Sequence, residues 1–387
     1  MQKKLIAAAV AGLIAVPALA QSNVTISGQM RVGIQNISAG GATAAGASLE
    51  SRSMLVDNNS NIRFAGTEAL GGGLTAWWQV ESAIGTTDNI GTTGAQNAVG
   101  NVTSIGTRNT AVGIRGAWGN VYMGKWDMHY SNHAGVDSAG LAGGLAVGAN
   151  TLNILHTQNG ANSAGGRYNN AVMYDSPNWN GFDVRLGYSF TAGSAATAQA
   201  NNESTAVNSR KESNWMINPR YTNGPIHVFY SHLARNNIGN VVSPAASPDA
   251  RFDRLGGAYT FGMGLKVGLI WDRNRLSPGA GAASTKRSAW ALPVTYVMGP
   301  HTFNGTYARA NDVSNTNNTG ANMWMLGYTY SLSKRTHLGF NWTKIRNESA
   351  ARYDLWHPSS SAAGASGAAL PLGSDPRQLS FNIHHSF

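Results

Sequence analysis

The sequence predicts an all-β fold, a 16-stranded antiparallel transmembrane β-barrel in which short turns alternate with long loops. The last eleven residues, Arg377–Phe387, provide the first observation. One face of this segment carries Leu379, Phe381, Ile383, His385 and Phe387, and the other face is polar throughout. This period of two is typical of a strand with one apolar face. A chain that ends on an aromatic residue of a regular strand is expected where that strand closes a barrel, because termini otherwise fray into polar residues.

The N-terminal segment predicts export. Lys3 and Lys4 precede the apolar run Leu5–Val16, and residues 1–20 end in Ala-Leu-Ala. This is the pattern of a cleaved signal peptide, with the cut after Ala20 and a single barrel domain over residues 21–387. The apolar run is shorter than the roughly 20 residues that a membrane helix needs.

Composition narrows the class further. The chain has no cysteine, 47 glycines and only 12% charged residues. An exported chain without disulfides must rely on its fold alone, and this composition suits turns and strands better than helices. Loss of Lys3 and Lys4 lowers the net charge from +10 to +8. Because the lysines form no cluster, we expect no nucleic-acid partner.

Sixteen segments of 6 to 11 residues have strand character. They are Val24–Ile34, Asn61–Thr67, Leu74–Val80, Asn109–Ala117, Val121–Trp126, Tyr168–Asp175, Phe182–Phe190, Asn214–Tyr221, Ile226–Ser231, Arg254–Phe261, Leu265–Asp272, Ala289–Val297, Thr302–Ala308, Met323–Tyr330, Thr336–Thr343 and the closing strand. Seven connections are short and contain turn dipeptides such as Gly-Asn and Asn-Gly. Eight are long: 37–59, 84–107, 127–166, 191–211, 236–250, 275–286, 311–320 and 347–376.

The two kinds of connection alternate strictly along the chain. Short periplasmic turns, long extracellular loops and an even number of strands are typical of bacterial outer-membrane barrels. A soluble β-sandwich or a β-solenoid does not explain why every second connection is long. Aromatic residues also occur near both ends of the strands, as expected for interfacial girdles. Those near short turns are Trp118, Trp179, Tyr221, Phe261 and Tyr296, and those near long loops are Trp126, Trp271 and Trp342.

Several segments resemble the general porins of Gram-negative outer membranes, of the neisserial and β-proteobacterial type. They are Val24–Gly28, Ile62–Gly73, Thr110–Lys125, Asn170–Phe182, Leu332–Thr336 and the closing strand, in this order along the mature chain. The resemblance implies a homotrimer of 16-stranded barrels whose third long loop, residues 127–166, folds inward and constricts the pore. It also implies that the barrel assembly machinery reads the strand ending at Phe387. We expect outer-membrane lipid, including lipopolysaccharide, to surround the barrel.

Strand alternation predicts which cations face the lumen. Arg31, Arg63, Arg115 and Lys125 lie on strands, and a charge on the lipid face costs about 2–4 kcal/mol at mid-membrane. We therefore expect these four side chains to point inward. The third loop offers only Asp127 and Asp137 as carboxylates, and Arg167 follows it. Because rings of Arg and Lys favour anions, the sequence predicts a preference for anions among small hydrophilic solutes.

Other functions find less support in the sequence. His129 and His133 have the spacing of a helical metal pair, but the glutamate of a zinc-protease helix is replaced by Tyr130. No nucleophile elbow or phosphate-binding loop is present, so we expect no catalytic residues, no cofactor and no metal site. A sugar-specific channel needs an aromatic track in the lumen, for which Trp77, Phe229 and Trp324 are the candidates. An adhesin would carry its function in the long loops, so this role stays open.

Overall fold

The computed structural model describes residues 24–45, 47–87, 105–128, 130, 136, 152–159, 166–190, 212–238, 248–279, 281–355 and 370–387. The predicted signal peptide, His129, His133 and Asp137 lie outside these residues. Within the described part, the strands are β1 (Thr25–Gly40), β2 (Leu49–Asp57), β3 (Asn61–Gly71), β4 (Leu74–Ala83), β5 (Thr110–Gly116), β6 (Gly119–Asp127), β7 (Arg167–Asp175), β8 (Phe182–Ser189), β9 (Ser213–Asn223), β10 (Ile226–Asn236), β11 (Asp249–Thr260), β12 (Leu265–Ser277), β13 (Thr285–Met298), β14 (His301–Ala310), β15 (Ala321–Ser331), β16 (Thr336–Asn347) and β17 (Asp375–Ser386). One short helix, α2 (Leu152–His156), lies between β6 and β7.

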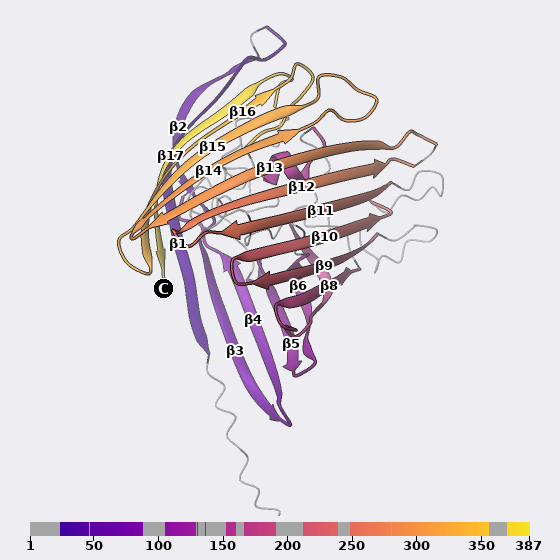
Figure 1. The fold of residues 1–387 in the computed structure, drawn as a ribbon, viewed down its shortest axis with the longest axis vertical. Helices are drawn as coiled ribbons and strands as arrows, with labels where there is room; N and C mark the ends of the chain where they lie inside the picture. Colours follow the sequence, from indigo (N-terminus) through magenta and orange to yellow (C-terminus); the bar gives the residue numbers. More distant parts are fainter. Residues whose placement is uncertain are drawn as a thin grey trace, which may run out of the picture.

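All described strands belong to one antiparallel sheet, and each pairs with its neighbour in sequence except β2 and β3, which do not pair with each other (Figure 1). β2 and β3 together fill one position in the sheet, because both pair with β1: β2 with its second half and β3 with its first. The Asp57 carboxylate interrupts the ladder by accepting the N–H groups of Asn59 and Ser60, each at 2.8 Å. The barrel therefore has the 16 positions that the sequence predicts.

The C-terminal strand closes the ring. β17 pairs with β16 on one side and with β1 on the other, so the sheet has no free edge. Gly28 and Phe387 exchange two backbone hydrogen bonds of 3.0 and 3.1 Å. A Cβ on Gly28 would lie 2.7 Å from the Phe387 ring, so only glycine admits this close approach. The closing role predicted for the last strand is confirmed.

Deletion of Phe387 is expected to weaken closure of the barrel. The variant loses both hydrogen bonds to Gly28, each worth about 1 kcal/mol, together with the ring that covers this glycine. We expect a smaller folded fraction on refolding in detergent and a lower temperature of unfolding. Both are measured by the heat-resistant band on a semi-native gel. The matched variant Phe387→Leu retains the backbone bonds, so its heat resistance is expected to lie between that of the wild type and that of the deletion variant. Equal heat resistance for the wild type and the deletion variant would contradict the prediction.

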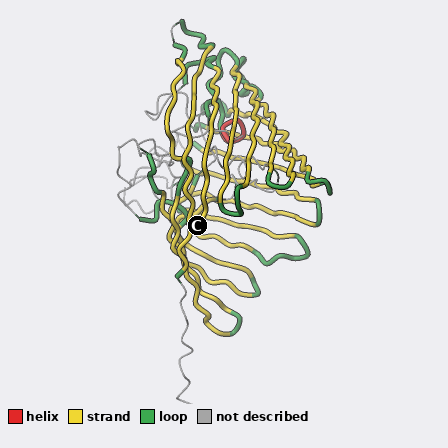
Figure 2. Tube along the Cα trace, turned by 90° about the vertical axis from the view of Figure 1, so that its left-hand side faces the viewer, coloured by secondary structure: helices red, strands yellow, loops and turns green. Residues whose placement is uncertain are grey.

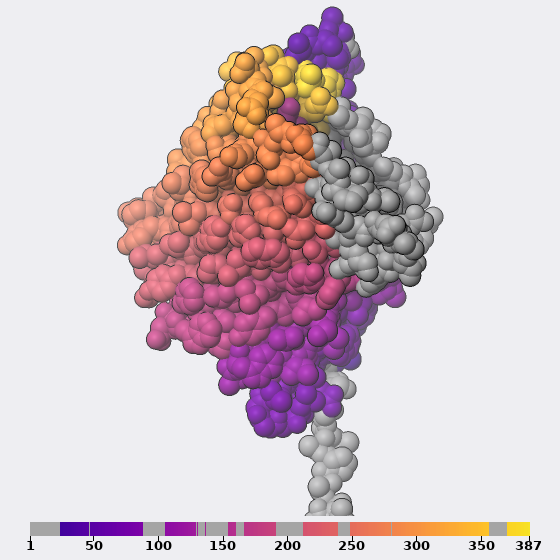
Figure 3. Space-filling model, turned by 90° about the vertical axis from the view of Figure 1, so that its right-hand side faces the viewer, coloured from indigo at the N-terminus to yellow at the C-terminus, as the bar shows by residue number. Residues whose placement is uncertain are grey.

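The two faces of the sheet differ as the alternation requires. Outward positions carry exposed apolar residues, for example Ile34, Leu269, Leu326, Phe381 and Ile383. Inward positions are mostly polar, such as Gln378, Ser380 and Asn382 on β17. Figure 3 shows successive strands side by side across the outer surface in sequence order. In the described part of the chain, no helix is long and apolar enough to cross a membrane.

The first long connection is shorter than the sequence suggests. Residues 37–59 were expected to form a loop, but β1 continues to Gly40 and β2 returns from Leu49, leaving residues 41–48 as the connection. The prediction failed because Ser, Ala and Gly dominate this segment and hide the alternation. The inward-facing Ile37 and Ala39 are nevertheless buried, at 1% and 0% exposure.

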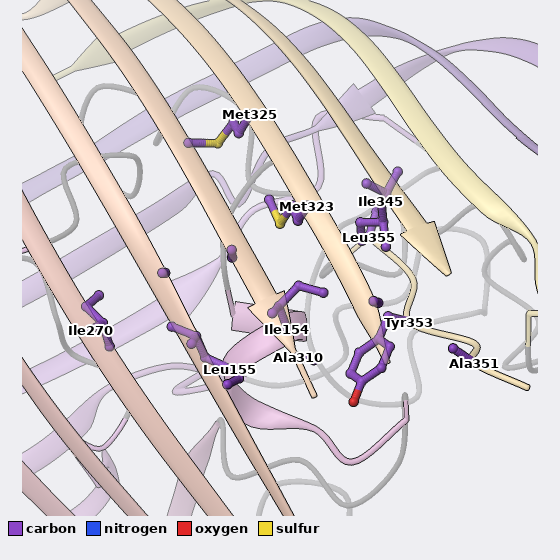
Figure 4. Packing of buried hydrophobic residues seen from close by; sticks show 14 of the residues in the cluster. Ile154, Leu155, Ile270, Ala310, Met323, Met325, Ile345, Ala351, Tyr353 and Leu355 are labelled. Atoms are coloured by element: carbon purple, nitrogen blue, oxygen red, sulfur yellow. The ribbon is translucent and has the colours of Figure 1, made fainter. Parts of the chain in front are cut away.

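The largest apolar core lies inside the barrel, where α2 contacts β12, β13, β14 and β15. Ile154 and Leu155 of the helix pack with Ile270, Ala310 and Met323, all on inward-facing positions (Figure 4). In the tube view the helix is drawn within the outline of the strands (Figure 2). The described residues of the segment between β6 and β7, among them Tyr130, Val136 and α2, therefore lie inside the barrel, as the resemblance implied.

Candidate functional site: the lumen and the inward-folded loop

The third loop leaves β6 after Asp127 and crosses to the opposite wall. Tyr130 already contacts β11 and β12. Val136 packs directly on Gly268 of β12. A Cβ on Gly268 would lie 2.6 Å from the Cγ1 atom of Val136. The glycine therefore lets the loop lie flat on the wall. The described residues of this loop carry no carboxylate beyond Asp127.

A buried ionic network holds the loop in place. Arg254 of β11 donates to the Asp272 carboxylate of β12 through Nε at 3.0 Å and Nη2 at 2.9 Å, and both side chains are fully buried. The Tyr130 hydroxyl also donates to Asp272, and the Arg254 guanidinium lies 4.5 Å from the Tyr130 ring centroid. Burial and the Asp272 charge raise the pKa of the Tyr130 phenol, so it stays protonated and can donate.

The same network reaches α2. Arg254 Nη1 lies 3.0 Å from His156 Nε2, and Arg287 of β13 donates to the Leu155 carbonyl at 2.9 Å and to the Thr157 carbonyl. Arg287 Nη1 is also 3.5 Å from Asp272. One carboxylate thus neutralises two buried arginines that hold both halves of the loop. Sequence reasoning missed this network, because its members lie on separate strands and on the third loop.

Four arginines gather where the third loop leaves and rejoins the barrel. We call Arg31 (β1), Arg63 (β3), Arg108 (before β5) and Arg167 (β7) the root cluster. Arg108 repels both Arg31 and Arg167 electrostatically, which places these three side chains near one another. Arg63 opposes Glu81 in the β3–β4 register, and Glu81 forms an ion pair with Arg108. Arg108 was not predicted, because it lies at the end of a long connection without strand alternation.

Asp127 belongs to the same region. Its carboxylate accepts a 2.9 Å hydrogen bond from Asn109 and lies 3.9 Å from Arg167 Nε, while Arg167 donates to Asn109 at 2.7 Å. The two residues also oppose each other in the β6–β7 register. The structure therefore brings together Arg31, Arg63, Asp127 and Arg167 of the predicted set.

Arg115 faces the lumen at a different height. It shares the parity of Gly113, which lies against Trp77 and Tyr122 inside the barrel. On β4, Arg115 opposes Thr75, whereas Arg63 opposes Glu81. Thr75 and Glu81 are six residues apart on the same strand. At about 3.3 Å per residue, Arg115 lies roughly 20 Å along the strand toward the short-turn end. The inward arginines therefore extend along the lumen from Arg63 to Arg115.

The structure corrects the predicted orientation of Lys125. We expected it to face inward, opposite Tyr122 and Trp126. These two rings instead lie inside, where their centroids are 5.4 and 6.0 Å from that of Trp77. Lys125 opposes Thr110 in the β5–β6 register, on the face opposite to Tyr122 and Trp126, and it is half-buried near Arg167. The prediction failed because it assigned aromatic residues to the lipid face, whereas here they pack on one another and beneath the third loop.

A closed barrel with an apolar outer face, a charged lumen and an inward-folded loop defines the class of pore-forming outer-membrane barrels. A family model for Gram-negative porins matches residues 7–350 of the chain. The chain belongs to this Gram-negative porin family, whose members are channels, and is an outer-membrane protein.

Two relatives illustrate the match. An outer membrane porin protein of Bordetella pertussis is 28% identical over 378 residues, covering 87% of this chain and 92% of the relative. Outer membrane porin protein 32 of Delftia acidovorans is 26% identical over 396 residues, and the match covers 100% of both chains. Among solved structures, an anion-selective porin from Comamonas acidovorans superposes with a TM-score of 0.69 at 23% identity, covering 95% of this chain and all of that chain.

Proposed function

We propose that this porin passes small hydrophilic solutes by passive diffusion and prefers anions. Arg63 and Arg115 carry the argument: both face the lumen, both are exposed, and neither has a carboxylate within ion-pair distance among the described residues. An exposed guanidinium in a narrow low-dielectric passage attracts anions and repels cations.

The lumen carboxylates do not offset these charges. The strand pairs Asp175–Arg185 and Asp183–Arg220 have nitrogen–oxygen distances of 3.9 and 2.7 Å. Glu81, Glu212 and Asp272 are likewise paired with arginines. Each of these five acids is therefore neutralised locally, and the uncompensated charge of the described lumen is positive. The name of the Comamonas structure, an anion-selective porin, supports the same preference.

Reversal potentials test this proposal. The purified protein is inserted into a planar bilayer with a KCl gradient, and the sign of the zero-current potential gives the preferred ion. We expect the sign of a chloride-preferring channel, with the preference reduced at high ionic strength because salt screens the lumen charges. A potassium-preferring channel would contradict the proposed selectivity, while an absence of conductance would contradict the pore itself.

A sugar-specific channel has weaker support. Trp77 and Phe229 face inward, but Phe229 is 2% exposed and packs on Gly256. Trp324 shares the outward parity of Leu326. The inward rings of Trp77, Tyr122 and Trp126 meet at interplanar angles of 55° and 70°, so they form a packed group rather than a flat track for sugar rings.

The finer partner assignments also belong to this proposal. We propose a homotrimer, which is supported by a Vibrio cholerae outer-membrane protein described as a trimer form that shares the fold with a TM-score of 0.65. We further propose contact with lipopolysaccharide around the barrel, recognition of the Phe387 strand by the assembly machinery, residues 127–166 as the constriction loop, and no catalysed reaction. In the described part of the chain, no group of His, Asp and Glu is arranged to hold a metal ion.

A further inference from the structure

Three cations lie in one row on the outer face of the barrel. Arg251 of β11 opposes Arg275 of β12, and Arg275 opposes Lys286 of β13. Arg273 lies two residues from Arg275 on the same face of β12. These side chains share the parity of Leu255, Leu269 and Leu292, whose side chains are exposed on the outer surface. The three strands lie side by side in Figure 1. We call Arg251, Arg275 and Lys286, together with the adjacent Arg273, the outer basic row.

This arrangement is unfavourable unless an anion binds to it. Like charges directly opposite each other across neighbouring strands destabilise a sheet, and the row contains two such pairs in succession. No described carboxylate lies within ion-pair distance of its members. Asp253 opposes Arg273 in the β11–β12 register but forms no ion pair with it, and instead accepts hydrogen bonds from Tyr230 at 2.6 Å and His232 at 2.7 Å. Asp249 accepts the N–H of Asn237.

The height of the row identifies the kind of anion. Trp271 and Trp290 oppose each other on the same outer face, four residues from Arg275 and Lys286 toward mid-membrane. At about 3.3 Å per residue, the row lies roughly 13 Å beyond this aromatic pair along the strands. Interfacial aromatic rings mark the head-group level, so cations just beyond them meet lipid phosphates. The row is at the long-loop end of the strands, which faces the outer leaflet.

We propose that the outer basic row binds the phosphate groups of the lipid A head group of lipopolysaccharide. Arginine forks bind phosphate oxygens through two parallel N–H donors, and the bound phosphate removes the repulsion within the row. Arg251 is held at one end of the row, since its Nη1 donates to the Arg235 and Ala250 carbonyls at 3.0 Å and its Nη2 donates to Asn236 Oδ1 at 2.8 Å. Arg273, Arg275 and Lys286 are exposed and face the membrane boundary. This inference rests on the lipopolysaccharide contact proposed above and assigns it to particular residues.

Binding of a fluorescent bis-phosphorylated lipid A to the folded protein in neutral detergent tests the assignment. The double variant Arg275→Gln/Lys286→Gln is expected to bind about 25-fold more weakly, since each surface cation contributes about fivefold to the binding of an anionic lipid. The matched control Lys334→Gln/Arg335→Gln removes the same charge from an exposed short turn at the other end. We expect it to bind within twofold of wild type, and dephosphorylated lipid A to lose most of its affinity.

Each other outcome is informative. If wild type binds no lipid A, the general lipopolysaccharide contact fails; if wild type binds and the double variant binds equally well, only the assignment to the row is overturned. Displacement of lipid A by an equal concentration of inorganic phosphate would show that the row binds a free anion, and it would overturn the assignment of lipid A as the ligand. Loss of the oligomer in the double variant would show that the row contacts a second copy of the chain and would also overturn the proposal.

Discussion

Replacing Asp272 with asparagine is expected to release the third loop from the wall while the barrel stays folded. The change leaves Arg254 and Arg287 buried without a counter-charge, and breaking a buried ion pair in this way costs about 3–5 kcal/mol. The strand ladder does not depend on this side chain, whereas Tyr130 and α2 do. We therefore expect local opening, with larger and noisier single-channel conductance and faster proteolysis within residues 127–166.

The matched control is Asp183→Asn. Asp183 pairs with Arg220 on neighbouring lumen strands at 2.7 Å, but the pair is partly exposed and contacts no described residue of the third loop. Its loss is expected to change conductance by much less, because exposed ion pairs contribute about 0–1 kcal/mol. Wild-type conductance and proteolysis for Asp272→Asn would show that the apolar packing of Ile154 and Leu155 is sufficient to hold the loop. Loss of the folded band would place the effect on the whole barrel instead.

Reversing the two exposed lumen charges is expected to reverse the selectivity. At a distance of about 7 Å in water, one unit charge interacts with a passing ion by about 0.6 kcal/mol, so replacing Arg with Glu changes this interaction by about 1.2 kcal/mol. That is roughly a sevenfold change in the Boltzmann weight of each ion at each site, in opposite directions for chloride and potassium, so the ratio of the two permeabilities changes by about 50-fold. The variant Arg63→Glu/Arg115→Glu should therefore shift the reversal potential strongly toward potassium. Single variants should shift it by about half as much.

The control has the same change in charge on the other face of the sheet. Arg273→Glu/Arg275→Glu lies on the outer surface of β12, where the wall separates it from the lumen. In a bilayer without lipopolysaccharide, we expect this variant to retain the wild-type reversal potential. Equal shifts in the two variants would mean that net charge, rather than charge in the lumen, sets the selectivity.

Sequence reasoning was most successful where local alternation and turn chemistry act alone. The strand number, the seven short turns and the closing strand all follow from a period of two interrupted by Gly and Asn, because a strand in a barrel has one lipid face and one lumen face along its whole length. Arg31, Arg63 and Arg115 were placed in the lumen for this reason. The alternation of β17 likewise placed His385 and Phe387 on the outer face, where both are exposed.

The same reasoning failed where long-range packing changes the meaning of a residue. Tyr122 and Trp126 were assigned to lipid because aromatic residues are common there, but inside the barrel they pack with Trp77. Lys125 was consequently placed on the wrong face. Arg108 joins the root cluster through Glu81, which is 27 residues away in sequence. No local pattern signals either contact.

The sequence by itself determined an exported, cysteine-free barrel of 16 strands with arginines on its inner face, because each of these features depends on residue type and spacing within one strand or turn. Only the tertiary structure decided that Asp272 neutralises Arg254 and Arg287 beneath the third loop, and that Arg251, Arg275 and Lys286 form one row. These features depend on the register between strands and on the path of a loop across the lumen. Both are set by contacts between residues distant in sequence, which periodicity within one strand does not specify.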